Sequence, residues 1–104
     1  MPSGRFGNAD LQANTDVDLY TVPVGTVATA NINLCNRSES PVRARIAIRS
    51  GALGSAHYLE YDALIPPNGV LGQTGVAMSP GEIITVRASA AGVSARAHGF
   101  EEAL

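Results

Sequence analysis

Residues 42–49 constrain the fold more than any other stretch of this sequence. Aliphatic side chains occupy every second position there, and Arg43, Arg45 and Arg49 lie between them. In a strand, which has a period of two, the aliphatic residues share one face and the arginines share the other. In a helix, at about 100° per residue, the arginines would scatter around the axis. The pattern therefore predicts a half-buried β-strand with a row of arginines on its solvent face.

A second alternating stretch precedes this strand. Between positions 28 and 34 every second residue is alanine, isoleucine or leucine, and residues 36–41 have turn composition throughout. We therefore expect residues 27–49 to form one long antiparallel hairpin. The aliphatic residues on the inward faces of the clearest alternations are the predicted core: Ile32, Leu34, Ile46, Ile48 and Val86.

The rest of the chain adds short strand-like stretches, divided by clusters of Gly, Pro, Asn and Ser. Spacings of about 10 to 14 residues, about seven strands in all and no helical pattern are typical of layered β proteins. The prediction is an all-β fold, a single β-sandwich that is immunoglobulin-like or jelly-roll-like, with the strand order left open. The added stretches lie near residues 18–23, 57–64, 70–78, 83–88 and 93–100.

Two tyrosines, Tyr58 and Tyr61, lie three residues apart in one of these stretches. In a regular strand, residues three apart point to opposite faces. We therefore expect the two rings on opposite sides of the sheet, with one of them substantially exposed.

Residues 1–17 differ in composition from the remainder of the chain. They are rich in Gly, Asn, Asp and Ser, with too few large apolar side chains to specify a strand. We expect a flexible, extended N-terminal arm, followed by a β-sandwich domain over residues 18–104. Phe6 and Leu11 are the predicted anchors of this arm on a neighbouring subunit, and a plain disordered terminus is the alternative.

Charge and cysteine content exclude several classes of protein. The formal net charge is −2 and all seven basic residues are arginine, so no basic excess points to nucleic acid. No apolar run has the length of a signal-peptide core or a membrane span, so we expect no contact with a membrane. Cys35 is the single cysteine and is predicted to be a free thiol.

Residue types used in catalysis and in metal binding are present, but they lack the spacing that either function needs. Ser55 and His57 lie in a glycine-rich loop that lacks the strand-to-helix turn of a hydrolase nucleophile. Asp16 and Asp18 have no further oxygen ligands at the intervals of a calcium loop. We therefore predict no catalytic residue, no cofactor site, no metal site and no enzymatic activity.

The arginine row carries the most directional charge in the sequence. Its simplest interpretation is a solvated strand face. The sharper interpretation is that Arg43, Arg45 and Arg49 contact acidic residues of a neighbouring subunit, because arginine makes bidentate pairs with carboxylates.

Six short stretches, distributed over nearly the whole length of the chain, carry a resemblance to known proteins. They are residues 9–16, 19–25, 33–37, 57–62, 65–69 and 99–102. In their order, and in their turn and strand signatures, they resemble small virion structural proteins of tailed bacteriophages. The resemblance implies a non-enzymatic subunit of the virion, a homo-oligomer that contacts other virion structural proteins and is assembled in the host cytoplasm.

Two functions are compatible with this resemblance. The first is a multi-copy structural component that decorates or cements the particle, at the capsid, neck or tail, through contacts between subunits. The second is a tail-tip or fibre-associated module that recognises a host-surface glycan. Exposed aromatic residues clustered in loops would favour the second function, and a flat polar face with an arm ordered on a neighbour would favour the first.

Overall fold

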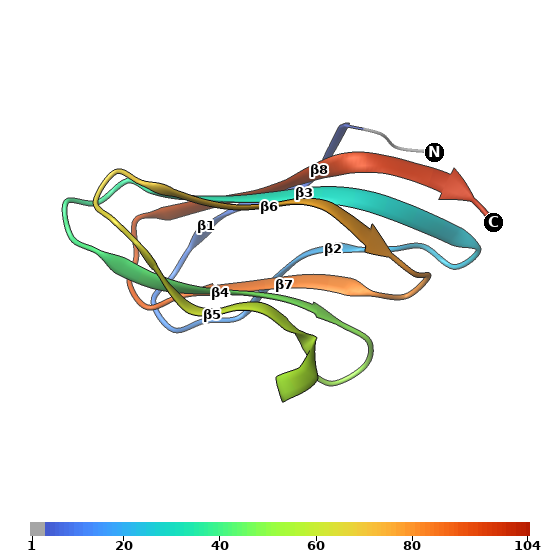
Figure 1. Ribbon diagram of the computed structural model, residues 1–104, viewed down its shortest axis with the longest axis horizontal. Helices are drawn as coiled ribbons and strands as arrows, with labels where there is room; N and C mark the ends of the chain where they lie inside the picture. The colour runs from blue at the N-terminus through green and yellow to red at the C-terminus, as the bar shows by residue number, and fades with distance from the viewer. Residues whose placement is uncertain (1–3) are drawn as a thin grey trace.

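The computed structural model describes residues 4–104, which form two layers of β-sheet (Figure 1). The all-β prediction is confirmed, and the one helical turn among these residues is the short 3-10 helix η1 (Ser55–His57). The first three residues of the predicted arm lie outside the described residues. The eight strands are β1 (Gly4–Leu11), β2 (Val17–Thr21), β3 (Thr26–Asn36), β4 (Val42–Arg49), β5 (Tyr58–Ile65), β6 (Val70–Met78), β7 (Ile83–Ala88) and β8 (Val93–Ala103).

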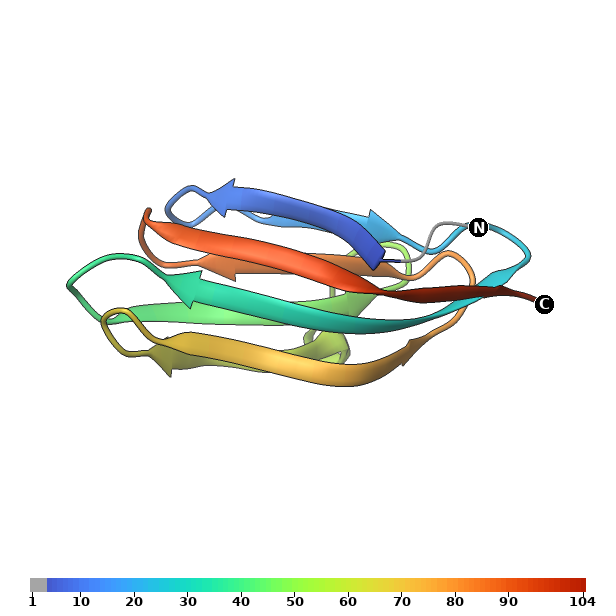
Figure 2. The same ribbon diagram turned by 90° about the horizontal axis from the view of Figure 1, so that it is seen from above.

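The strands form two four-stranded antiparallel sheets. Sheet A has the order β1-β8-β3-β6 and sheet B the order β2-β7-β4-β5. Four of the strand pairs are nested around the connection between β4 and β5: β4 with β5, β3 with β6, β2 with β7 and β1 with β8. Figure 2 shows the consequence, with β1 and β2 along one side of the two layers and β5 and β6 along the other.

The core lies between the sheets, where the inward faces of the alternating strands meet. Ile32, Leu34, Ile46 and Val86 are buried as predicted. Ile48 is only partly buried, at the end of β4 that approaches the loop before η1. Period two therefore identified the inward faces of both β3 and β4.

The predicted hairpin over residues 27–49 is wrong, because β3 and β4 lie in different sheets. The intervening turn carries the chain from sheet A across to sheet B. The physical reason is that two strands with one aliphatic face each can bury those faces against one another across the core as well as side by side. Alternation identifies the buried face of a strand, but it does not determine which strand pairs with it.

The segment expected to be an arm is a strand of its own domain over residues 4–11. β1 pairs with β8, and Leu11, opposite Val93, is fully buried in the core. Phe6 stacks on Tyr20 of β2, with ring centroids 4.1 Å apart. The proposed anchoring of Leu11 on a neighbouring subunit is therefore wrong, and Phe6 already has a partner in its own chain.

A buried asparagine fixes the end of the molecule where β3 leaves sheet A. Asn36 is fully buried, and its Nδ2 donates to the backbone carbonyls of Ser40 at 2.8 Å and of Ile65 and Pro66 at 3.2 Å. Its Oδ1 accepts from the backbone N–H of Ser38 at 3.0 Å. One side chain thus ties the turn after β3 to the turn after β5, with its hydrogen-bonding groups paired as burial requires.

Candidate functional site

Three of the four ion pairs among the described residues lie on the outer face of sheet B. Arginines from β4 and β7 lie there beside aspartates from β2, β5 and the loop before β2. We call this surface the arginine face. Its charged members are Arg43, Arg45, Arg49, Arg87, Asp16, Asp18 and Asp62.

Arg45 lies at the centre of the arginine face. Its Nε donates to Asp62 Oδ1 at 2.7 Å and its Nη2 to Oδ2 at 3.3 Å, which is a bidentate pair. The hydrogen bond from Arg45 holds the pKa of Asp62 below its ordinary value. The guanidinium carbon also lies 4.2 Å from the centre of the Tyr61 ring, within cation–π range.

Arg49 is held by three partners. It donates to Asp18 Oδ2 at 2.6 Å, to Thr85 Oγ1 at 3.0 Å and to the carbonyl of Gly51 at 2.7 Å. Partial burial raises the pKa of Asp18, but hydrogen bonds from Thr85 and Arg49 outweigh it, so the pKa of this carboxyl is lowered. The group therefore stays ionised and paired.

Arg43 differs from the other arginines of this face. Arg87 pairs with Asp16 at 3.2 Å, but Arg43 is exposed and forms no ion pair within residues 4–104. Its Nη1 donates to the backbone carbonyl of Asp62 at 3.0 Å. Contact with an acidic neighbour stays a prediction for Arg43, whereas Arg45 and Arg49 already have carboxylate partners in their own chain.

The two tyrosines of β5 lie on the same side of sheet B, so the prediction of opposite faces is wrong. Their ring centroids are 4.9 Å apart and the rings meet edge to face at 83°. The reason is the pairing of β5 with β4, whose register shifts twice, between Ala44 and Ile46 and between Ile46 and Ala47. Each bulge inserts an extra residue into β5 and breaks the alternation. The expectation of one exposed ring is confirmed, because Tyr61 is 60% exposed.

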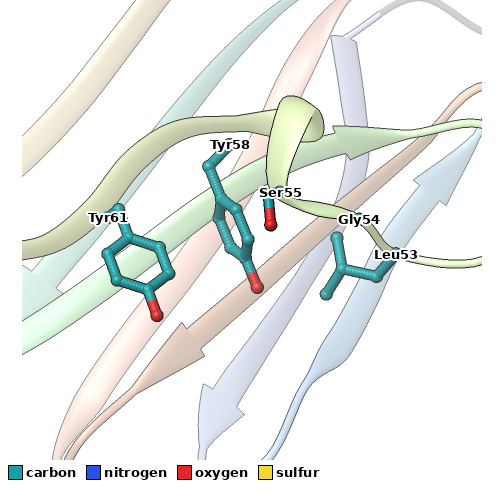
Figure 3. Close-up of a pocket in the computed structure, with 5 residues that line it drawn as sticks. All are labelled: Leu53, Gly54, Ser55, Tyr58 and Tyr61. Atoms are coloured by element: carbon teal, nitrogen blue, oxygen red, sulfur yellow. The ribbon is translucent and has the colours of Figure 1, made fainter.

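A shallow hollow of about 500 Å³ opens beside this tyrosine pair, between β5 and the loop that precedes it (Figure 3). Leu53, Gly54 and Ser55 form its other wall. The loop is held by a hydrogen bond from the backbone N–H of Gly54 to Nδ1 of His57, at 2.9 Å. His57 therefore stabilises the conformation of the loop that forms this wall.

A second, smaller cleft of about 60 Å³ lies on the arginine face. Arg45 and Asp62 line it, and Arg45 contacts Tyr61, which lines the larger hollow. The remaining residues that line the cleft are Asn14, Arg43, Arg87, Ala88 and Ser89.

The outer face of sheet A has a different character. On its central strand β3 the outward residues between positions 29 and 35 are Thr29, Asn31, Asn33 and Cys35. Cys35 is a free thiol, as predicted. The outward side chains of β3 are therefore small and polar, whereas the neighbouring strands add Arg96, Phe100 and Val70 to this face.

The residues considered for chemistry have other contacts in the structure: Asp16 and Asp18 pair with Arg87 and Arg49. Ser55 lines the larger hollow, and Nδ1 of His98 is buried with no hydrogen-bond partner among the described atoms. Within residues 4–104 no three His, Cys, Asp or Glu side chains gather closely enough to hold a metal ion. Over the same range no helix is long and apolar enough to cross a membrane.

A scan against protein-family models, a search of curated proteins and a search of solved structures each found no match to this chain.

Proposed function

We propose that this protein is a non-enzymatic structural component of a tailed-phage virion, a multi-copy subunit that decorates or cements the particle. It does so through contacts with copies of itself and with other virion structural proteins, at the capsid, neck or tail. The resemblance of its sequence to small virion proteins supplies the biological setting. The surface of the β5–β6 edge supplies the physical reason.

The strand order supports this proposal at the level of fold. Nested pairs distributed over two sheets, in the orders β1-β8-β3-β6 and β2-β7-β4-β5, are the arrangement of a jelly-roll sandwich. We therefore infer a jelly roll in preference to an immunoglobulin-like sandwich. Jelly rolls occur in viral capsid proteins and also in lectin domains, so the fold by itself does not choose between particle assembly and carbohydrate binding.

The β5–β6 edge is the observation that carries the proposal. Both strands are outermost in their sheets, and three large aliphatic side chains along them are about half exposed: Leu59 at 44%, Leu64 at 53% and Val70 at 59%. Arg43 is the cross-strand neighbour of Leu64. Val70 is the cross-strand neighbour of Cys35, so exposed aliphatic side chains line this edge from the outer faces of both sheets. Exposed aliphatic side chains beside an arginine have the composition of a protein–protein contact.

The backbone of this edge favours contact through side chains. An exposed edge strand has unpaired backbone N–H and C=O groups that can pair with a strand of another chain. A β-bulge is one feature that prevents such pairing. β5 carries two bulges and β6 one, next to Gly75, whose N–H donates to Asn31 Oδ1 at 2.9 Å. A subunit of this kind can present Leu59, Leu64 and Val70 to a neighbour without adding its strands to that neighbour's sheet.

The test is to locate the protein in purified particles. Quantitative mass spectrometry should find it in many copies, and a cryo-electron microscopy map should place the β5–β6 edge against another subunit. Leu64→Asp should lower occupancy on particles, whereas Thr29→Asp, on the central strand of sheet A, should leave it unchanged. Absence of the protein from particles would overturn the proposal.

A second candidate function is supported by the tyrosine pair. A tail-tip or fibre-associated module that binds a host-surface glycan needs aromatic side chains beside a hollow, and the exposed Tyr61 and the partly buried Tyr58 provide them. The two functions are compatible, because the tyrosine hollow and the aliphatic residues Leu64 and Val70 occupy different parts of the surface.

A further inference from the structure

The two hollows on sheet B combine three kinds of chemistry. Tyr58 and Tyr61 present aromatic rings, the loop presents the hydroxyl of Ser55, and Arg43 and Arg45 present guanidinium groups. We call Tyr58, Tyr61, Arg43 and Arg45 the tyrosine–arginine site. Apart from Arg43 and Arg45, none of these groups belongs to the interface predicted from the sequence.

The tyrosines give the site two apolar ring surfaces, nearly perpendicular to each other, each ending in a hydroxyl group. In Figure 3 the two side chains lie beside one another, with Ser55 and Leu53 beyond Tyr58. A tyrosine ring offers an apolar face and a hydroxyl that can donate and accept. A pyranose ring has the matching pattern, with C–H bonds on its faces and hydroxyl groups around its edge.

The orientation of Tyr61 is fixed before any ligand arrives. One face of its ring is covered by Arg45 at 4.2 Å, and Tyr58 meets it edge to face at 4.9 Å. Arg45 is in turn fixed by its bidentate pair with Asp62. A platform held in this way loses little side-chain entropy on binding, which favours affinity.

Charge at the site favours an anion. The arginine face holds four arginines against three aspartates, although the whole chain has a formal net charge of −2. The excess resides in Arg43, which is exposed and forms no ion pair among the residues described. A carboxylate is the anion whose planar geometry suits the guanidinium fork.

The volumes of the hollows divide the ligand in the same way. The larger hollow, about 500 Å³, is within the range of roughly 300–1,000 Å³ for small-molecule sites. The smaller cleft, about 60 Å³, is too small for a sugar ring but can admit a carboxylate. A ring and an acidic group that are bonded to each other therefore match two hollows that are separated by the contact between Arg45 and Tyr61.

We propose that the tyrosine–arginine site binds an acidic carbohydrate, with a uronic acid residue in the hollow lined by Tyr58 and Tyr61 and its carboxylate at Arg43. This inference specifies a ligand class for the second candidate function and does not rest on the virion assignment. A particle subunit that binds no sugar would show no binding in titrations with such a ligand and would still be found in purified particles, so the two failures are distinguishable.

An extended acidic peptide fits the site less well. Peptides that bind sheets add as a strand along a regular edge, and the two bulges of β5 interrupt that edge beside the tyrosines. The larger hollow also lies between β5 and the loop before it, and its lining residues do not continue along a strand beyond Tyr61. A short poly-glutamate peptide is therefore the comparison ligand in the test.

The test titrates tetragalacturonate into the full-length protein, with its methyl ester as the matched neutral ligand. Calorimetry should give a dissociation constant of about 0.1 to 1 mM for the acid and binding at least about fivefold weaker for the ester. Added salt should weaken the binding of the acid and leave the binding of the ester unchanged, because only the acid makes ionic contacts. In amide NMR spectra the shifted signals should belong to residues 53–62 and to the neighbourhood of Arg43.

Two variants and two controls localise the binding. Tyr61→Ala should weaken the binding of both ligands by about tenfold. Arg43→Gln should weaken the binding of the acid by about fivefold without affecting that of the ester. Phe100→Ala and Arg96→Gln remove an exposed aromatic residue and an exposed arginine from sheet A, and should leave both affinities unchanged. If Tyr61→Ala fails to fold, Arg43→Gln and the NMR shifts still decide the question.

Each other outcome overturns part or all of the proposal. No binding of either ligand at about 10 mM, where contacts of this number would be detectable, rejects the site. Equal affinity for acid and ester rejects the role of Arg43. Tighter binding of poly-glutamate than of tetragalacturonate rejects the carbohydrate, and loss of binding in Phe100→Ala places the ligand on the other sheet.

Discussion

The two sides of this molecule, where the outer strands of sheet A meet those of sheet B, are built differently. At the β1–β2 edge the two sheets come into backbone contact at Gly7, where a Cβ atom would lie 2.1 Å from the carbonyl oxygen of Leu19. Phe6 stacks on Tyr20 there, and the hydroxyl of Tyr20 donates to Glu101, which is 6% exposed. This edge is sealed by packing.

At the β5–β6 edge the sheets are joined more loosely. The amide of Gln73 donates to Glu60, whose side chain is only partly buried, in contrast to Glu101. Leu59, Leu64 and Val70 are left about half exposed. One edge therefore contributes to the stability of the subunit, and the other leaves apolar surface free for a neighbour. Substitutions that fall on one edge or the other should separate these two roles.

The largest effect is expected at Gly7. In Gly7→Ala the new methyl group meets the Leu19 carbonyl at 2.1 Å, and the backbone must move apart. We expect a loss of about 4 kcal/mol in the free energy of unfolding, a large part of the roughly 5 to 15 kcal/mol that stabilises an ordinary domain. Gly72→Ala on β6 is the matched control, because its nearest neighbour atom, the carbonyl oxygen of Ile32, lies 3.6 Å away.

Urea denaturation of the two variants gives the comparison directly. Gly72→Ala should change the free energy of unfolding by less than about 1 kcal/mol, because the methyl group fits and alanine lowers the entropy of the unfolded chain. Equal stability of the two variants would mean that β1 and β2 can move apart at little cost, and that the edge is not sealed by close approach.

The next effect is expected at Leu11, the residue that places β1 in the core. Leu11→Ala removes a fully buried side chain and should cost about 3 kcal/mol. Leu59→Ala, on the opposite edge, removes a side chain that is 44% exposed and should cost less than about 1 kcal/mol. Thermal unfolding followed by circular dichroism measures both. A Leu11→Ala variant as stable as the parent would restore the flexible arm predicted from composition.

The arm prediction shows where sequence reasoning lost information. Composition counts large apolar residues, and β1 has few, because the inward positions next to Leu11 are Gly7 and Ala9. They lie opposite Ala97 and Ala95 of β8, so the contact is made by small residues from both strands. Close approach between small residues leaves no hydrophobic signal in the sequence, although it lets β1 pack against the rest of the domain.

The faces of strands were predictable and their partners were not. Period two is a property of one strand, so it identified the buried faces that carry Ile32, Leu34 and Ile46. The pairing of strands depends on contacts between distant parts of the chain, which is why β3 and β4 were assigned to one hairpin. The same limit hid the pairs of Arg45 with Asp62 and Arg49 with Asp18, because each joins two strands.

The tyrosine–arginine site was hidden by bulges. Alternation placed Tyr58 and Tyr61 on opposite faces, and the bulges of β5 place them on one. Asp62 has a φ of 53°, a left-handed conformation that aspartate tolerates better than most residues. An aspartate between a tyrosine and an alanine is too weak a signal to predict a bulge from one sequence.

A smaller effect is expected when the polar contact of the sealed edge is removed. Tyr20→Phe leaves Glu101 buried without the donor that it has now, and should cost about 1 to 2 kcal/mol near neutral pH. Gln73→Leu removes the corresponding donor from the β5–β6 edge. Glu60 is only partly buried there and can be solvated by water, so the cost should be below about 1 kcal/mol.

Tyr20 also predicts a dependence of stability on alkaline pH. Burial, and then the hydrogen bond to Glu101, raise the pKa of Tyr20 well above its ordinary value. The folded state therefore holds the phenolic proton more tightly than the unfolded state does. Stability from this group is fully present below about pH 10, the ordinary pKa of tyrosine, and falls as pH rises further.

Urea denaturation at a series of pH values separates this contribution. The parent should lose stability above the ordinary tyrosine pKa, and Tyr20→Phe should lose less over the same range. If both proteins lose stability in parallel, the hydroxyl of Tyr20 is not the group whose proton the fold retains.

The smallest change in stability, and the largest change in assembly, is expected at the open edge. Leu64 and Val70 flank the turn between β5 and β6 and are more than half exposed, so the double variant Leu64→Ser/Val70→Ser should change the free energy of unfolding by less than about 0.5 kcal/mol. The same substitutions remove apolar area from the surface that we propose contacts neighbouring subunits, and should lower occupancy on particles.

Val24→Ser is the control, because Val24 is 95% exposed in the turn between β2 and β3, away from this edge. A fall of several degrees in the melting temperature of the double variant would mean that the open edge supports its own subunit. Unchanged occupancy would move the subunit contact elsewhere on the surface, and would remove the functional distinction between the two edges.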